Sequence, residues 1–142
     1  RHHLLGLRTA ERPTFYAQSL GPLVTARAIL DAVSQGRIDV GPLDAYWHML
    51  IKKHQPEVTV GVRVIEATDV APMPSFVAAP GLPARDVAAL RQAFATARQR
   101  PWFASLAEVL LLDGFAAMTQ DDFEITLAWD REAKAQGYPF PA

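Results

Sequence analysis

The sequence predicts an α/β fold, in which a mostly parallel sheet flanked by helices is followed by a group of carboxyl-terminal helices. Two observations predict this fold. Up to residue 79, short β-prone runs alternate with segments whose apolar residues recur at helical spacing. From Pro83 onward the apolar residues follow the helical period alone. Strands that alternate with helices imply right-handed crossovers, and such crossovers build a parallel sheet.

The alternating part is expected to contain helices at residues 23–34 and 45–54. The first has its apolar residues on one face, and Gly36 lies where a glycine can end a helix. The second follows Asp44, a good helix cap, and stops before Pro56, because proline disfavours helix in the preceding residue. The runs expected to be extended are residues 14–18, 38–43, 62–67 and 75–79.

Three helices are expected after Pro83. The first ends before a proline, and a shorter one follows at residues 102–111. The last begins at Thr119, where a threonine cap and an acidic first turn suit a helix start, and it ends at Gly137 before an irregular tail. The first of the three carries an apolar stripe, which consists of Val87, Leu90 and Phe94.

Composition excludes several classes of partner. The chain has 142 residues, of which 50% are hydrophobic, so it is long enough and apolar enough to bury a core. A formal net charge of −1 does not indicate the excess of positive charge that nucleic-acid binding needs. No apolar stretch reaches the ~20 residues that span a bilayer, so direct membrane insertion is not expected. Without cysteine there is no disulfide, no thiolate catalysis and no cysteine-based metal site.

Enzyme motifs are absent from the sequence. It contains no nucleophile elbow, P-loop, dinucleotide-binding glycine pattern or paired-histidine zinc helix. His48 and His54 lie six residues apart, which points them in different directions on a helix. The acidic pair Asp121 and Asp122 is explained by helix-start electrostatics. We therefore predict a protein that is not an enzyme and that uses neither a cofactor nor a metal.

Two positions remain as candidate ligand contacts. The first is the turn that contains Ser19, Gly21 and Thr25, where a strand is expected to give way to a helix. Unpaired backbone N–H groups and the positive end of the helix dipole attract anions at such a turn. Simple helix capping explains the same residues, and Pro22 removes one N–H donor.

The second position is Asp44 with Tyr46 and Trp47, again after an expected strand. Ligands of open α/β sheets bind at the carboxyl ends of the strands. A carboxylate beside two aromatic rings can receive an ammonium group and cover the body of a ligand. The alternative is that Asp44 caps the helix and the two rings belong to the core.

The run at residues 28–47, AILDAVSQGRIDVGPLDAYW, resembles the second-lobe signature of phosphonate-type periplasmic solute-binding proteins of ABC transporters. The later runs at residues 62–65 and 71–77 and the helix after Leu82 continue the resemblance in order. It implies a type II periplasmic-binding-protein-like lobe, and it implies that the chain is the carboxyl-terminal portion of such a protein. The implied segments are a terminal or upstream stretch at 1–13, a second-lobe α/β unit at 14–73, and a return crossover with carboxyl-terminal helices at 74–142.

The resemblance also implies a function. A small solute, phosphonate or a related anion, would bind between two lobes and be delivered to an ABC permease, in the periplasm or outside the cell, where a lipid anchor is compatible with the chain. Asp44 would reach the ligand with Tyr46 and Trp47 beside it, and the turn from Ser19 to Thr25 would hold an oxyanion. The family usually has Gly-Ser-His at that turn, whereas this chain has no histidine there.

Other functions remain open on the same scaffold. One is a ligand-sensing domain of a regulator or receptor, and another is an enzyme of the type that makes a thiamine pyrimidine precursor. In each case the apolar stripe after Pro83 is expected to pack on a first lobe outside this sequence or on a second copy of the chain, since large apolar patches are rarely exposed.

Overall fold

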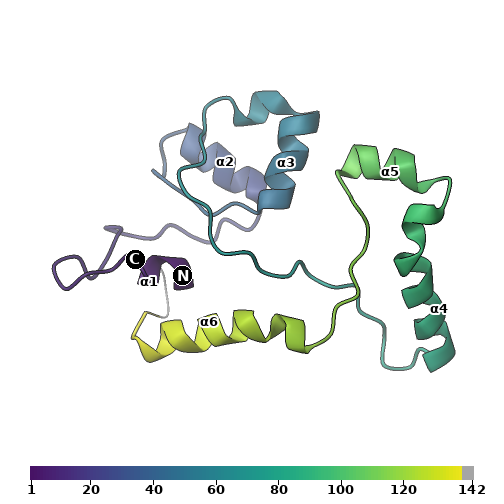
Figure 1. The fold of residues 1–142 in the computed structure, drawn as a ribbon. Coiled ribbons are helices and arrows are strands. Elements are labelled where there is room, and N and C mark those ends of the chain that lie inside the picture. Colours follow the sequence, from purple (N-terminus) through teal and green to yellow (C-terminus); the bar gives the residue numbers. More distant parts are fainter. Residues whose placement is uncertain (139–142) are drawn as a thin grey trace. The chain divides into compact units, whose positions relative to one another are not determined.

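The computed structural model describes residues 1–138, and these residues form helices joined by extended segments, with no strand among them (Figure 1). They fall into two compact units. Unit 1 comprises Arg1–Ala71 and the chain from Glu124 onward, and unit 2 comprises Pro72–Phe123. Unit 1 contains α1 (His2–Leu5), α2 (Ala26–Ser34), α3 (Ala45–His54), the 3-10 turn η1 (Pro56–Thr59) and α6 (Glu124–Ala135). Unit 2 contains α4 (Ala84–Ala95), η2 (Ala97–Gln99), α5 (Phe103–Leu110) and η3 (Asp121–Phe123).

The predicted α/β fold is wrong for the described residues, and so is the parallel sheet of a type II periplasmic-binding-protein-like lobe. The four runs expected to be strands, at residues 14–18, 38–43, 62–67 and 75–79, are extended or bent segments without a hydrogen-bonded neighbour strand. β-propensity describes how a side chain fits a paired, half-buried surface, so it cannot create a strand where no neighbour pairs with it. Val64 at 66% and Val77 at 90% exposure show that these runs lack a cover.

The helices were predicted more successfully. The structure confirms the helix at residues 45–54 with its bounds, and its last turn carries Lys52, Lys53 and His54, which complement the helix dipole. The helix expected at 23–34 begins three residues later, at Ala26, because Thr25 caps it. It ends at Ser34, as expected, with Gln35 as its C-cap, and the next residue is Gly36, whose φ of +67° suits glycine.

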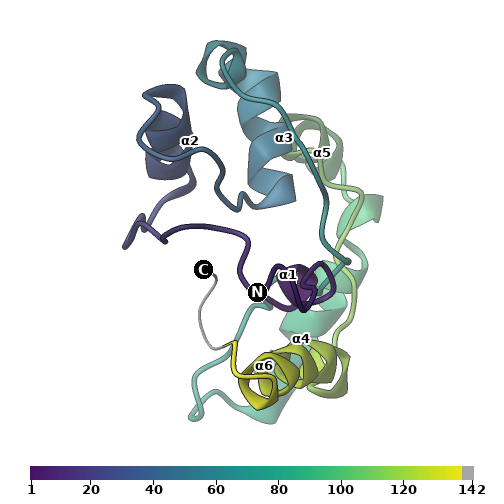
Figure 2. The same cartoon turned by 90° about the vertical axis from the view of Figure 1, so that its left-hand side faces the viewer.

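Helices α1 and α6 pack against each other within unit 1 (Figure 2). The His2 ring stacks on Trp129, with centroids 5.2 Å apart, and His2 Nε2 lies 2.9 Å from a Glu132 carboxylate oxygen. Arg1 forms an ion pair with Asp130. These contacts join the first and last described helices of the chain.

The end of α6 follows a recurrent pattern. The predicted stop at Gly137 is confirmed, since this glycine has a φ of +65°. The Tyr138 N–H donates to the Ala133 carbonyl at 2.8 Å and the Gly137 N–H to the Lys134 carbonyl at 3.1 Å, which together satisfy carbonyls that the helix leaves open. Tyr138 is buried, with the Arg8 guanidinium 4.8 Å from its ring centre. The remainder of the predicted irregular tail lies outside the described residues.

Unit 2 is organised by an aromatic cluster. Phe94 of α4 stacks on Phe76 at 4.9 Å and meets Phe115 edge-on at 5.0 Å between ring centres. Phe103 at the start of α5 is buried and packs against Phe115 and Trp102. Edge-to-face and offset arrangements are the favoured geometries for such rings, so the cluster links α4 and α5, although Phe103 is its buried ring and Phe76 remains 77% exposed.

The apolar stripe predicted on the helix after Pro83 is covered in part. Phe94 belongs to the aromatic cluster and Val87 is half-buried, but Leu90 remains 49% exposed. The cover of Phe94 comes from Phe76, which lies in a run that the sequence had suggested to be a strand. The stripe is therefore uncovered mainly at Leu90.

Candidate functional site

The predicted anion turn contains an exposed segment and a helix cap. Ser19 and Gly21 are exposed, and a Cβ added to Gly21 would meet no atom within 4 Å. Thr25 is the N-cap of α2, and its hydroxyl oxygen accepts a hydrogen bond from the Ala28 N–H at 3.1 Å. The capping role is therefore present at Thr25. One hydroxyl satisfies one of the amino-terminal N–H groups, and a helix start has several more.

The second predicted contact lies at the start of α3. Asp44 is the N-cap, and its Oδ1 accepts a hydrogen bond from the Trp47 N–H at 2.6 Å. Tyr46 and Trp47 are half-buried rather than core residues. The carboxylate itself is exposed. Asp44 thus caps the helix, which is one of the two roles that the sequence left open for it.

The two turns lie in the same unit and at the same end of a helix pair. Both views draw the amino-terminal ends of α2 and α3 at one end of that pair (Figures 1 and 2). The connecting segment returns along α2, because Gly41 packs against Ile29 so closely that an added Cβ would lie 2.6 Å from its Cγ2 atom. Only glycine allows this approach. The packing brings the chain back to Asp44 after the end of α2.

Two cavities lie elsewhere, and none of the six predicted contact residues lines either of them. A cavity of about 350 Å³ in unit 1 lies between α1, Thr68–Asp69 and α6, with Arg1, His2, Trp129 and Asp130 among its lining residues. His3 also lines it, and its Nε2 atom is buried without a hydrogen-bond partner. No local pattern in the sequence indicates the partners of His2 on α6, which are Trp129 and Glu132.

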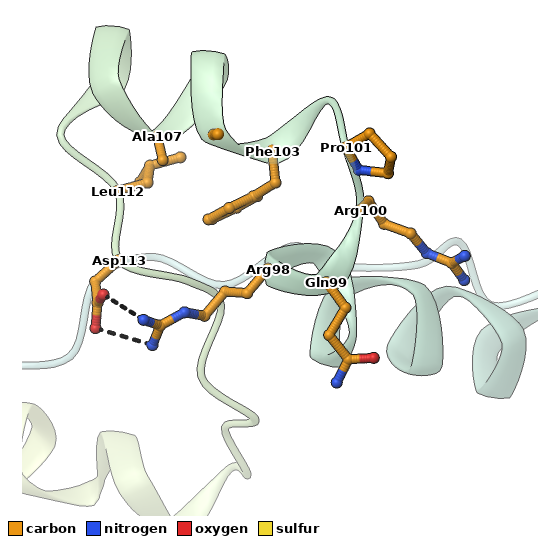
Figure 3. A pocket seen from close by; sticks show the side chains of 9 residues that line it. Arg98, Gln99, Arg100, Pro101, Phe103, Ala107, Leu112 and Asp113 are labelled. Atoms are coloured by element: carbon orange, nitrogen blue, oxygen red, sulfur yellow. Dashed lines mark hydrogen bonds and ion pairs between the residues drawn. The ribbon is translucent and has the colours of Figure 1, made fainter.

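The larger cavity, of about 430 Å³, lies in unit 2 beside α5 (Figure 3). Arg98 extends beneath the Phe103 ring to Asp113, with which it makes a two-point ion pair with N–O distances of 3.0 and 3.3 Å. Ala107 and Leu112 line the same cavity from the other side. Sequence reasoning missed this arrangement, because its residues come from separate turns of the chain and follow no motif.

One acidic pair is explained by local structure. The Asp122 carboxylate accepts hydrogen bonds from the Thr119 N–H at 2.6 Å and the Thr119 hydroxyl at 2.8 Å. These two bonds, the backbone one first, lower the pKa of Asp122 below its ordinary value. The contact runs opposite to the predicted threonine cap, since the acid reaches back to Thr119. A capping box uses its acid in this way, but the expected helix start at Thr119 is wrong, because α6 begins at Glu124 after the 3-10 turn η3.

Two features are absent among residues 1–138, a cluster of metal-ligating side chains and a helix of membrane-spanning length. No three histidine or acidic side chains there come close enough to hold a metal ion. None of the described helices has the length and apolar character needed to cross a membrane.

The comparisons identify a family. The model of the family described as "ABC transporter, phosphonate, periplasmic substrate-binding protein" matches residues 10–123, which is most of the chain. Neither a curated protein nor a solved structure matches the chain. The family match confirms the resemblance found in the sequence at residues 28–47.

Proposed function

Since the chain belongs to the family of periplasmic substrate-binding proteins of phosphonate ABC transporters, we propose that it is the solute-binding component of an importer. It binds a small polar or anionic solute in the periplasm and delivers it to a membrane permease. A binding protein needs a site and a closed state that the ligand favours, but no turnover. The absence of recognised catalytic motifs from the sequence agrees with this role.

The observation that carries the site assignment is the common end of α2 and α3 (Figures 1 and 2). The start of α2, after Ser19, Gly21 and Thr25, offers backbone N–H groups and a positive dipole end to an oxyanion. The start of α3 offers the Asp44 carboxylate with Tyr46 and Trp47 half-buried beside it. These two ends differ in charge preference, so they suit a solute with an anionic group and a cationic or hydrogen-bond-donating group.

Calorimetry on the intact protein tests the proposal with two probes, 2-aminoethylphosphonate and ethylphosphonate. Both carry the anion, but only the first has the ammonium that Asp44 can bind. We expect Asp44→Ser to weaken binding of 2-aminoethylphosphonate roughly tenfold, the cost of one charge-assisted hydrogen bond, and to leave ethylphosphonate unchanged or slightly tighter.

Asp39→Ser is the matched control, because Asp39 is exposed, lies five residues before Asp44 and removes the same charge. It is expected to leave both affinities unchanged. If neither probe binds the intact protein, the proposed solute class is wrong. If 2-aminoethylphosphonate binds equally well to Asp44→Ser, the assignment of Asp44 is wrong although the function stands.

A further inference from the structure

We propose that the cavity beside α5 in unit 2 is a second binding site, separate from the site at α2 and α3, for a small organic anion with an apolar body. Its volume of about 430 Å³ falls in the range of small-molecule sites. Its lining combines the guanidinium groups of Arg98 and Arg100 with apolar side chains, which are those of Phe103, Ala104, Ala107 and Leu112. A guanidinium group binds an oxyanion and an apolar surface covers a hydrocarbon body, so the two together define the ligand class.

Arg98 supplies the anion-binding group. Its guanidinium already binds a carboxylate at two points, with Asp113 oxygens 3.0 and 3.3 Å away, so its fork has the geometry that carboxylates and phosphonates require. Its stem passes over Gly114, where an added Cβ would come within 3.1 Å of the Arg98 Cδ atom.

The Asp113 carboxylate occupies the position on Arg98 that the oxyanion of a ligand would take. Its side chain is 92% exposed and that of Arg98 is 64% exposed, and ion pairs this open to water contribute little to stability. A ligand oxyanion that also buries an apolar body against Phe103 gains more than Asp113 can, because it adds hydrophobic contact to the same ion pair. Binding therefore proceeds by displacement of Asp113 from Arg98.

The orientation of the neighbouring cation supplies a matched control. Arg100 also lines the cavity, but Figure 3 shows its side chain pointing away from Arg98 and the Phe103 ring. It has the same charge, two residues away on the same short segment. A general attraction of anions to positive charge would use both arginines, whereas the proposed site uses Arg98 alone.

The test is a titration of the whole chain with phenylphosphonate, in which binding is measured by the NMR line broadening of this probe. Inorganic phosphate serves as the head-only control and benzyl alcohol as the body-only control, and both are expected to bind much more weakly. The titrations are repeated in a Gly21→Asp background, where an added Cβ meets no atom within 4 Å and the new carboxylate repels an anion from the start of α2.

We expect Arg98→Gln to weaken phenylphosphonate binding roughly tenfold, since it removes a charge-assisted two-point contact, and Arg100→Gln to change it less than twofold. Asp113→Asn is expected to tighten binding roughly threefold to tenfold, because it removes the competing carboxylate. Ala107→Leu is expected to weaken binding by filling the apolar end of the cavity.

Three results overturn the inference. The first is equal loss in Arg98→Gln and Arg100→Gln, which indicates attraction to charge without a site. The second is weaker binding in Asp113→Asn, which shows that the ion pair supports the fold instead of competing with ligand. The third is binding of phenylphosphonate that Gly21→Asp abolishes and Arg98→Gln leaves intact, which places the probe at the start of α2 and supports the proposed function while removing the second site.

Discussion

Replacement of Asp44 separates two effects that the same carboxylate produces. Asp44→Ala removes the oxygen that accepts from the Trp47 N–H at 2.6 Å, and it leaves that N–H at the start of α3 without its protein partner. Loss of an N-cap of this kind costs about 1 kcal/mol, with a usual range of about 0.5 to 2 kcal/mol. Asp44→Ser retains a capping oxygen and is expected to cost only a few tenths of a kcal/mol.

Urea denaturation measures the difference. With a denaturant dependence of about 2 kcal/mol per molar urea, a loss of about 1 kcal/mol lowers the midpoint by about 0.5 M. Trp47 is a suitable fluorescent reporter, because it lies in the first turn of α3 and its backbone N–H donates to the Asp44 cap. The remaining tryptophans, Trp102 and Trp129, are replaced by phenylalanine in every variant so that fluorescence follows α3 alone.

The reasoning is refuted if Asp44→Ser lowers the midpoint as much as Asp44→Ala, since the serine hydroxyl can take the same hydrogen bond. It is also refuted if Asp44→Ala leaves the midpoint unchanged. Together with calorimetry, the pair of variants gives a sharper outcome: both variants remove the charge, so both weaken binding of 2-aminoethylphosphonate, while only the alanine variant destabilises the helix.

Two further predictions follow from local geometry. Gly41→Ala is expected to destabilise unit 1 by roughly 1–3 kcal/mol in urea denaturation, because its Cβ would lie 2.6 Å from the Ile29 Cγ2 atom. Gly61→Ala is the control, because the nearest atom to its added Cβ is 3.7 Å away, and it should destabilise the protein much less. Equal effects of the two substitutions would contradict the close approach at Gly41. Asp122, with its lowered pKa, stabilises the start of α6 when ionised, so this contribution is present at neutral pH and lost as the pH falls below about 4. Asp122→Asn should remove that acid-dependent part of the loss of helical circular dichroism, and an unchanged acid profile would show that Asp122 has no such role.

The sequence predicts those features of this chain that depend on neighbouring residues. The bounds of α3 follow from Asp44 and Pro56, which act within one turn of the helix, and the end of α6 follows from Gly137. The start of α2 was misplaced because the apolar period already includes Leu23, whereas the cap at Thr25 decides where helical hydrogen bonding begins.

Features that depend on distant residues were not predictable in this way. A strand exists only with a partner, and residues 62–67 have β-branched side chains but no neighbour strand among the described residues. The stacking of Phe76 on Phe94 and the ion pair between Arg98 and Asp113 join residues 18 and 15 positions apart. No helical or strand period links such positions, so only the folded chain reveals these contacts.

The two interpretations of Asp44 from the sequence, helix cap or ligand contact, are compatible in the structure. The cap uses Oδ1, and a carboxylate has a second oxygen with lone pairs for an ammonium or a hydroxyl group. Capping also fixes the side chain at the start of α3, and a side chain that is already ordered loses less entropy when a ligand binds. As the proposed ligand contact, Asp44 would therefore gain from being a cap. This explains why Asp44→Ser, which preserves the cap but removes the charge, is the variant that tests binding itself.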